Sequence, residues 1–200
     1  MDLGTGDGRA VLARATKEPC SLVIGVDAAA AAMAESSRRA DRRRMANVLF
    51  LAEGVERLAD SPLTGAADLV TVILPWGSLA RGILGFDDDA LGGVAAVLAP
   101  GGRLEVFVSV TPSDHVAGLP RLTEAHETTI ASAWSSAGLR LASMRPATDA
   151  EVAASGSTWA RRLRSGAGAS RPVWRLTGAR RMPERDATVA GWHGTSSSSD

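Results

Sequence analysis

The chain has 200 residues, of which 45% are hydrophobic, and its 22 basic and 22 acidic side chains give a formal net charge of zero. This length supports one sizeable core, and the balanced charge argues weakly against nucleic-acid binding. No apolar run approaches the ~20 residues that cross a bilayer, no basic-then-apolar stretch of the secretory kind opens the sequence, and the lone Cys20 excludes an internal disulfide and a thiolate metal cluster. We expect a cytoplasmic, single-domain monomer that does not contact membranes, with Cys20 buried just before a strand.

The sequence opens on a glycine-rich loop, Asp2-Leu-Gly4-Thr-Gly6-Asp7-Gly8-Arg9. Glycines at alternate positions allow sharp turns and close approach of the backbone to a ligand, and the carboxylates between them accept hydrogen bonds. Such a loop is typical of sites for nucleoside-containing cofactors. The buried strand that normally precedes it would have to lie before Asp2, where only Met1 stands, so we expect the first strand to be truncated or missing.

Apolar, β-branched runs then alternate with helical patterns, which predicts an α/β fold with a mostly parallel sheet and helices on both faces. The strand candidates are Ser21 to Val26, Val48 to Leu51, Asp68 to Leu74, Arg103 to Val110, Leu139 to Met144 and Val173 to Thr177. The helix candidates are Arg9 to Thr16, Ala29 to Ala46, Leu79 to Leu98, Thr123 to Ala137 and Asp149 to Leu163, although Gly156 argues against one continuous final helix. Residues 182–200 lack apolar periodicity and are expected to be disordered.

The carboxylates of the first half indicate which cofactor the loop holds. Asp27 ends the first of these predicted strands, where it can accept hydrogen bonds from both hydroxyls of a ribose in NAD or in S-adenosylmethionine (SAM). The loop departs from the G-x-G-x-x-G spacing that places a pyrophosphate on a helix N-terminus, and Asp7 would repel a phosphate. SAM has no phosphate and carries cationic amino and sulfonium groups, so these residues favour SAM.

A third cofactor contact is expected after the next strand, in Ala52-Glu53-Gly54-Val55-Glu56. The backbone around Glu53 and Gly54 is the candidate for the adenine of the cofactor. Acidic residues at this place are also favourable as helix N-terminal charges, and for Glu56 the two interpretations are equally good.

Two tryptophans stand where a substrate could meet the cofactor. Trp76 follows a strand in Leu74-Pro75-Trp76-Gly77-Ser78, and an indole face stacks a flat base for about 1 to 3 kcal/mol. The alternative is that Trp76 belongs to the core. Trp159 precedes Arg161, Arg162 and Arg164, which combines a stacking ring with groups that bind phosphates. A base held between the two indoles is the predicted geometry, whereas Trp134 and Trp174 lie in apolar patterns and are expected in the core.

Taken together, the glycine loop, Ile-Gly-Val-Asp27, Leu-Pro-Trp76-Gly-Ser-Leu-Ala-Arg-Gly and Ser-Thr-Trp159-Ala-Arg-Arg-Leu resemble the aminoglycoside-resistance 16S rRNA (adenine(1408)-N1)-methyltransferases, from Asp2 to about Gly178. The resemblance implies a Rossmann-like SAM-dependent methyltransferase domain over residues 1–181. It also implies methylation of N1 of adenine 1408 in 16S rRNA of the 30S subunit, which gives aminoglycoside resistance. Members of the family carry a hairpin and a complete first strand before the glycine loop.

The resemblance also assigns roles to individual residues. Those around SAM would be Asp2, Gly4, Gly6, Asp7, Asp27, Ala28, Glu53, Gly54 and Leu74. Trp76 and Trp159 would hold the flipped adenine, and Ser157 would help to shape its pocket. The rRNA backbone would be held by Arg38, Arg39, Arg42, Arg43, Arg44, Arg161, Arg162, Arg164 and Arg171. The alternative for the arginines on helices is a solvated face.

Little acid or base chemistry is needed for this reaction, because adenine N1 has a lone pair in the ring plane and positioning it supplies most of the rate. We therefore expect no metal and no catalytic histidine; His115 and His126 have no partner at ligand spacing. Two other functions stay open. One is a SAM-dependent methyltransferase of small molecules, against which the arginine-rich segment from Glu151 to Arg185 argues, with its eight arginines and two acidic residues. The other is an inactive SAM-binding protein that serves only in interactions.

Overall fold

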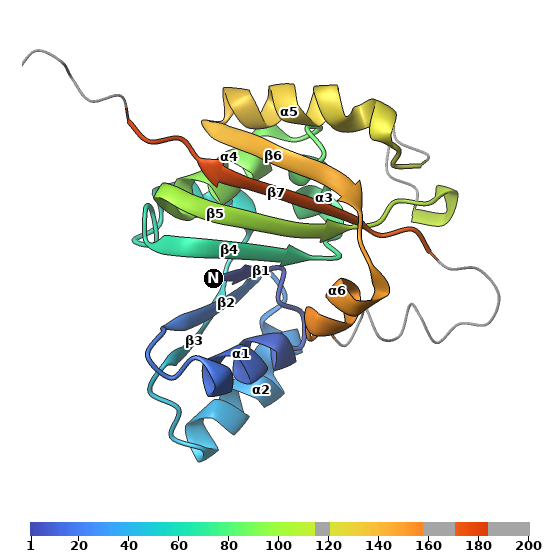
Figure 1. The fold of residues 1–200 in the computed structure, drawn as a ribbon. Helices are drawn as coiled ribbons and strands as arrows, with labels where there is room; N and C mark the ends of the chain where they lie inside the picture. Colours follow the sequence, from blue (N-terminus) through green and yellow to red (C-terminus); the bar gives the residue numbers. More distant parts are fainter. Residues whose placement is uncertain (115–120, 158–170, 184–200) are drawn as a thin grey trace, which may run out of the picture.

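The computed structural model describes residues 1–114, 121–157 and 171–183, and these form one mixed, mostly parallel sheet of seven strands in the order β3-β2-β1-β4-β5-β7-β6 (Figure 1). The strands are β1 (Asp2–Leu3), β2 (Val23–Asp27), β3 (Val48–Ala52), β4 (Ala67–Ile73), β5 (Leu98–Val108), β6 (Leu139–Pro146) and β7 (Trp174–Arg180). The first five in chain order pair in parallel, and β7 pairs antiparallel with both β5 and β6. The predicted fold class is confirmed.

Helices cover both faces of this sheet. They are α1 (Arg9–Lys17), α2 (Ala30–Arg42), α3 (Gly77–Ile83), α4 (Asp88–Val97), α5 (Glu127–Ser136) and α6 (Asp149–Ala154), with 3-10 turns η1 (Val55–Asp60), η2 (Pro112–Asp114) and η3 (Glu124–His126). The large core lies under α3, α4 and α5, where Ile83, Leu91 and Trp134 are fully buried. Two smaller apolar clusters lie under α1 and α6.

The first strand is short rather than missing. Asp2 pairs with Gly25 of β2 and with Thr71 of β4, so β1 lies between them as the parallel topology requires. Met1 extends the connection, because its ammonium donates to the Leu69 carbonyl at 2.7 Å and its carbonyl accepts from the Thr71 N–H at 2.9 Å. Two residues of β1 therefore stand beside the five of β2 and the seven of β4.

Three predicted helices differ from the structure: one is divided in two, and two end earlier than expected. The segment Leu79 to Leu98 forms two helices, because Gly85 takes a φ of +83° and Asp87 caps the second helix through the Ala90 N–H at 3.2 Å. The helix predicted over Ala29 to Ala46 ends at Arg42. The last one ends at Ala154, before Gly156 at φ +73°, and its predicted continuation from residue 158 lies outside the described residues.

β5 begins at Leu98, ahead of the predicted Arg103, because the Pro-Gly-Gly segment stays in the strand with a register irregularity against β4. Cys20 is exposed, which corrects the expectation of a buried thiol: it lies in the turn after α1, ahead of β2. Trp134 and Trp174 are buried, as predicted.

Most of the tail, 184–200, lies outside the described residues, and its disorder stays a prediction. Among the described residues, no helix is long and apolar enough to span a membrane, and no three metal-ligating side chains cluster.

Candidate functional site

A cavity of about 630 Å³ lies at the carboxyl ends of the parallel strands. It brings together all nine residues predicted to contact a cofactor, with Trp76 and Ser157 at the same cavity. Its lining comprises Asp2, Leu3, Gly4, Thr5, Gly6, Asp7, Ala10, Val26, Asp27, Ala28, Glu53, Gly54, Val55, Glu56, Leu58, Ile73, Leu74, Pro75, Trp76, Ser78, Leu79 and Ser157. Apolar Val55 and Leu58 were missed, although their spacing directly after Gly54 indicates one apolar face of a helical turn.

The glycine loop forms one wall through backbone turns that side chains would hinder. Gly4 has a φ of +69°, and a Cβ there would lie 2.8 Å from Cδ2 of Leu79. Gly8, at φ +70°, precedes α1, and a Cβ there would lie 2.6 Å from Cε1 of Phe50. Both positions therefore require glycine, since a side chain would be strained and would collide with a neighbour.

Asp27 joins this loop to the end of β2. Its Oδ2 accepts from the Gly6 N–H at 2.8 Å, and its Oδ1 accepts from the Ala29 N–H at 2.9 Å. Each carboxylate oxygen can accept a second hydrogen bond. Asp27 is thus held by backbone groups in a position to accept the two hydroxyls of a ribose.

Asp2 lies deepest among the acidic residues of the cavity and is only 7% exposed. Its carboxylate accepts from the hydroxyls of Thr5 at 2.7 Å and Thr71 at 2.8 Å. Burial raises the pKa of Asp2 above its ordinary value, and the two hydroxyls oppose that change only in part. Asp2 therefore fixes the start of the loop to β4 and supplies acceptor oxygens at its base.

The charge of the lining is one-sided. Five carboxylates, those of Asp2, Asp7, Asp27, Glu53 and Glu56, belong to it, and no lysine, arginine or histidine is among its described residues. A cavity of this charge attracts a cation and repels a phosphate. Its acceptor pair at Asp27 and its apolar residues after Gly54 fit a nucleoside that carries positive charge.

The strand that ends at this cavity turns sharply away from the sheet. Leu74 has a φ of +52°, a conformation that costs a non-glycine residue about 1 to 3 kcal/mol. The turn carries Pro75 and Trp76 outward, and Trp76 is 51% exposed at the start of α3. The alternative that Trp76 is a core residue is therefore wrong.

Arg171 lies against the indole of Trp76, with its guanidinium carbon 5.8 Å from the ring centroid. Its Nε donates to Oγ of Ser109 at 2.9 Å, its Nη2 donates to the Ser109 carbonyl at 3.2 Å, and it forms an ion pair with Asp114. Burial would raise the pKa of Asp114, but the hydrogen bonds from Arg171 and Thr111 outweigh it and hold that pKa below its ordinary value. These residues line a second cavity of about 190 Å³, which shares Leu74, Pro75 and Trp76 with the first.

The arginines predicted to bind RNA fall into separate groups. Those of the first group are exposed on α2 and just after it: Arg38, Arg39, Arg42, Arg43 and Arg44. Two of them, Arg38 and Arg42, pair with Glu35 at 3.2 and 2.9 Å. Arg171 lies three residues before β7, which belongs to the other half of the sheet. Outside the described residues lie Trp159, Arg161, Arg162 and Arg164.

Comparison with known proteins agrees with this geometry. A family model described as NpmA, 16S rRNA (adenine(1408)-N(1))-methyltransferase, matches residues 1–178. A protein of that name from Streptoalloteichus tenebrarius is 35% identical over 179 residues, which cover 82% of this chain and 80% of the relative.

Solved structures are similar as well. The crystal structure of the 16S rRNA methyltransferase KamB superposes with a TM-score of 0.80 at 33% identity, over 90% of this chain and 86% of that one. A 16S rRNA (adenine(1408)-N(1))-methyltransferase variant from Catenulisporales acidiphilia, crystallised with its cosubstrate SAM, has a TM-score of 0.80 at 31% identity, over 92% and 86% of the two chains. The chain therefore belongs to the 16S rRNA (adenine(1408)-N(1))-methyltransferase family.

Proposed function

We propose that this protein transfers a methyl group from SAM to N1 of adenine 1408 in the 16S rRNA of the 30S subunit, and so gives resistance to aminoglycosides. One observation carries the proposal beyond family membership. The anionic cavity adjoins Trp76, a half-exposed indole that Arg171 contacts from the second cavity. A cationic cofactor and a flat base thus have adjacent places, as a methyl transfer to a nucleobase needs.

The described residues fit SAM, which when bound supplies a methyl group on a positively charged sulfur. Asp27 would accept hydrogen bonds from its ribose, and the backbone at Glu53 and Gly54, with Val55, would contact its adenine. The glycine loop and Asp2 would face its amino-acid part, where the ammonium favours carboxylates.

The base would stack on Trp76, which is worth about 1 to 3 kcal/mol. N1 of a neutral adenine carries no proton, so no side chain has to remove one, and orientation is the main contribution of the protein. Ser157 at the cavity wall would help to confine the base.

Arg171 would meet the phosphates next to the flipped nucleotide, and the exposed arginines of α2 would contact rRNA further away. Such contacts favour the assembled 30S subunit as substrate and the cytoplasm as the place of action. A monomer suffices for this site, because every residue invoked belongs to one chain. Light scattering on the purified protein tests the monomeric state.

Primer extension on 30S subunits incubated with the protein and SAM tests the activity. A reverse-transcription stop at adenine 1408 that needs SAM is the expected result, because methylation of N1 blocks base pairing. Subunits with guanine at 1408 are the matched control and should give no stop, and naked 16S rRNA tests whether the assembled subunit is needed. Tight SAM binding by calorimetry without any stop on 30S subunits would overturn the proposal in favour of a small-molecule substrate or a binding protein without activity.

A further inference from the structure

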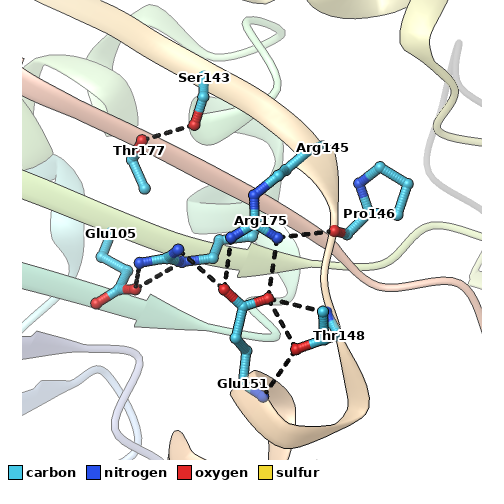
Figure 2. Close-up of polar contacts among 8 residues, drawn as sticks. All are labelled: Glu105, Ser143, Arg145, Pro146, Thr148, Glu151, Arg175 and Thr177. Atoms are coloured by element: carbon cyan, nitrogen blue, oxygen red, sulfur yellow. Dashed lines mark hydrogen bonds and ion pairs between the residues drawn. The ribbon is translucent and has the colours of Figure 1, made fainter.

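Four charged side chains of alternating sign connect α6 to the antiparallel end of the sheet (Figure 2). Glu105 of β5 accepts from Arg175 of β7 at 2.8 Å, and Arg175 donates to Oε1 of Glu151 at 3.0 Å. Arg145 of β6 donates to both oxygens of Glu151, from Nη1 to Oε2 at 2.9 Å and from Nη2 to Oε1 at 2.5 Å. We call Glu151 with its two arginine partners, Arg145 and Arg175, the charge clamp; Glu105 contacts Arg175 from the side away from α6.

Glu151 is needed in this arrangement for an electrostatic reason. Arg145 and Arg175 lie directly opposite each other in the β6–β7 register, and like charges in that position repel. Glu151 lies between them and accepts from both guanidinium groups. The Arg145 contact, with help from the Thr148 N–H, lowers the pKa of Glu151 far below its ordinary value, so this carboxylate stays charged.

Glu151 also ties α6 down at its own start. Its Oε2 accepts from the Thr148 N–H at 2.9 Å, while the Glu151 N–H donates to Oγ1 of Thr148 at 3.3 Å, which forms a capping box. A helix of six residues has little stability of its own. The place of α6 on the sheet is therefore set by tertiary contacts, which are the charge clamp and the buried Val152.

α6 is connected to the candidate functional site at two points, Val152 and the nearby Ser157. Val152 packs with Leu74 and Phe107 in one apolar cluster, and Leu74 is the strained residue that directs Trp76 outward. Three residues beyond α6, Ser157 lines the anionic cavity. A shift of α6 would thus move the support under Leu74 and one wall of the cavity together.

From this placement we propose that Glu151 is a positioning residue for methyl transfer: the charge clamp holds α6 so that Val152 supports the Leu74–Trp76 turn and Ser157 faces the cofactor cavity. The inference rests on the proposed function, since it concerns how that site orients its acceptor base. It assigns to Glu151 no contact with either substrate.

Glu151→Gln tests the inference, with Glu105→Gln as the matched control. Both changes remove one negative charge and one ion pair to Arg175, but Glu105 contacts Arg175 from β5 and touches no residue of α6 itself. Its loss leaves both bonds of Glu151 to the sheet in place. For Glu151→Gln we expect kcat on 30S subunits to fall about 10- to 100-fold, because small misplacements of a reacting group have effects of this size. Its affinity for SAM, measured by calorimetry, should fall much less than kcat, within about threefold, because the glycine loop, Asp27 and the backbone at Glu53 and Gly54 make most of the proposed SAM contacts and lie outside α6. Glu105→Gln should keep kcat within about threefold of the wild type.

The outcomes distinguish a failure of the proposed function from a failure of the positioning role of Glu151. If wild-type protein gives no methylation of 30S subunits, the proposed function fails and the role of Glu151 falls with it. If the wild type is active but the two variants lose kcat equally, or Glu151→Gln keeps full kcat, the positioning role is overturned. Should Glu151→Gln fail to fold, Arg145→Gln removes the bidentate pair but leaves the Arg175 bond to Glu151. The Arg145→Gln variant must then show the loss of kcat expected for Glu151→Gln, with SAM affinity again within about threefold of the wild type.

Discussion

The two halves of the molecule hold their functional groups by different means. In the cofactor half, from β1 to η1, the carboxylate of Asp27 is fixed by N–H groups of the backbone, and the loop turns at glycines. In the substrate half, from the turn at Leu74 to β7, positions depend on ion pairs between side chains such as Arg171 with Asp114 and Arg145 with Glu151. Backbone contacts survive most substitutions, whereas each ion pair fails when one partner changes. We therefore expect single charge changes in the substrate half to displace groups of the site, and those in the cofactor half to remove direct contacts with the cofactor.

The largest expected effect separates two tryptophans of the substrate half. Trp134 is fully buried and its Nε1 donates to the Ile83 carbonyl at 2.9 Å, so Trp134→Ala should lower the free energy of unfolding by about 3 to 5 kcal/mol. Trp76→Ala should leave that free energy nearly unchanged, because the ring is half exposed, but reduce methylation about 5- to 150-fold through lost stacking. Urea unfolding and primer extension measure the two effects.

Calorimetry with SAM supplies the control for these variants. Trp76→Ala should bind SAM with nearly wild-type affinity if the indole serves the base alone. A strong loss of SAM affinity in this variant would show that Trp76 also contributes to the cofactor site.

A charge change in the cofactor half should act on SAM binding alone. Asp27→Asn removes the charged acceptor of the Gly6 and Ala29 N–H groups, and we expect SAM affinity to fall about 10- to 150-fold, as loss of a hydrogen bond to a charged group does. Asp60→Asn is the matched control. This aspartate is exposed at the end of η1 and does not line the cavity, so the change should stay within about threefold. Equal losses in both variants would contradict the special place of Asp27.

The glycine loop can be tested without altering any charge. Gly8→Ala places a Cβ 2.6 Å from Phe50 at a φ of +70°, and we expect it to lower the free energy of unfolding by about 1 to 3 kcal/mol. Gly92→Ala, inside α4 with nothing within 4 Å of the new Cβ, should instead stabilise the protein by about 0.5 to 1 kcal/mol. Thermal melting of both variants measures the difference, and a harmless Gly8→Ala would refute the account of this turn.

The smallest effects concern pH, and they have opposite signs in the two halves. Burial raises the pKa of Asp2, so the folded state keeps the proton of this carboxyl at pH values at which the unfolded chain has lost it. The free energy of unfolding therefore decreases as the pH rises from the unfolded pKa of about 4 to the higher folded pKa. Asp2→Asn removes this penalty. Its melting temperature should exceed the wild-type value at about pH 7, and the difference should vanish below the ordinary pKa of about 4.

Asp114 should behave in the reverse way. Its pKa is lowered in the folded state, so the stability it contributes is present above its unfolded pKa of about 4 and is lost as pH falls through the folded pKa. Asp114→Asn should therefore melt lower than the wild type at neutral pH, with a difference that shrinks in acid. A shift of the same sign for both variants would contradict this assignment.

The predictable part of the molecule lies where neighbouring residues act together. The glycine loop, Asp27 and Glu53-Gly54 were all recognisable because each combines a backbone demand or a carboxylate with the end of a strand, and parallel strands bring their ends to one edge. The break at Gly85 and the exposure of Cys20 were not predicted, since helical pattern and average burial say little about where a chain must turn.

By itself the sequence determined the alternation of strands and helices and the acidic character of the cofactor cavity, because hydrophobic period, glycine and carboxylates act locally. Only the tertiary structure decided that two residues suffice to place β1 between β2 and β4, that Leu74 turns Trp76 outward, and that Glu151 joins α6 to β6 and β7. These depend on strand register, which brings together side chains such as Glu105 and Arg175 from distant parts of the chain.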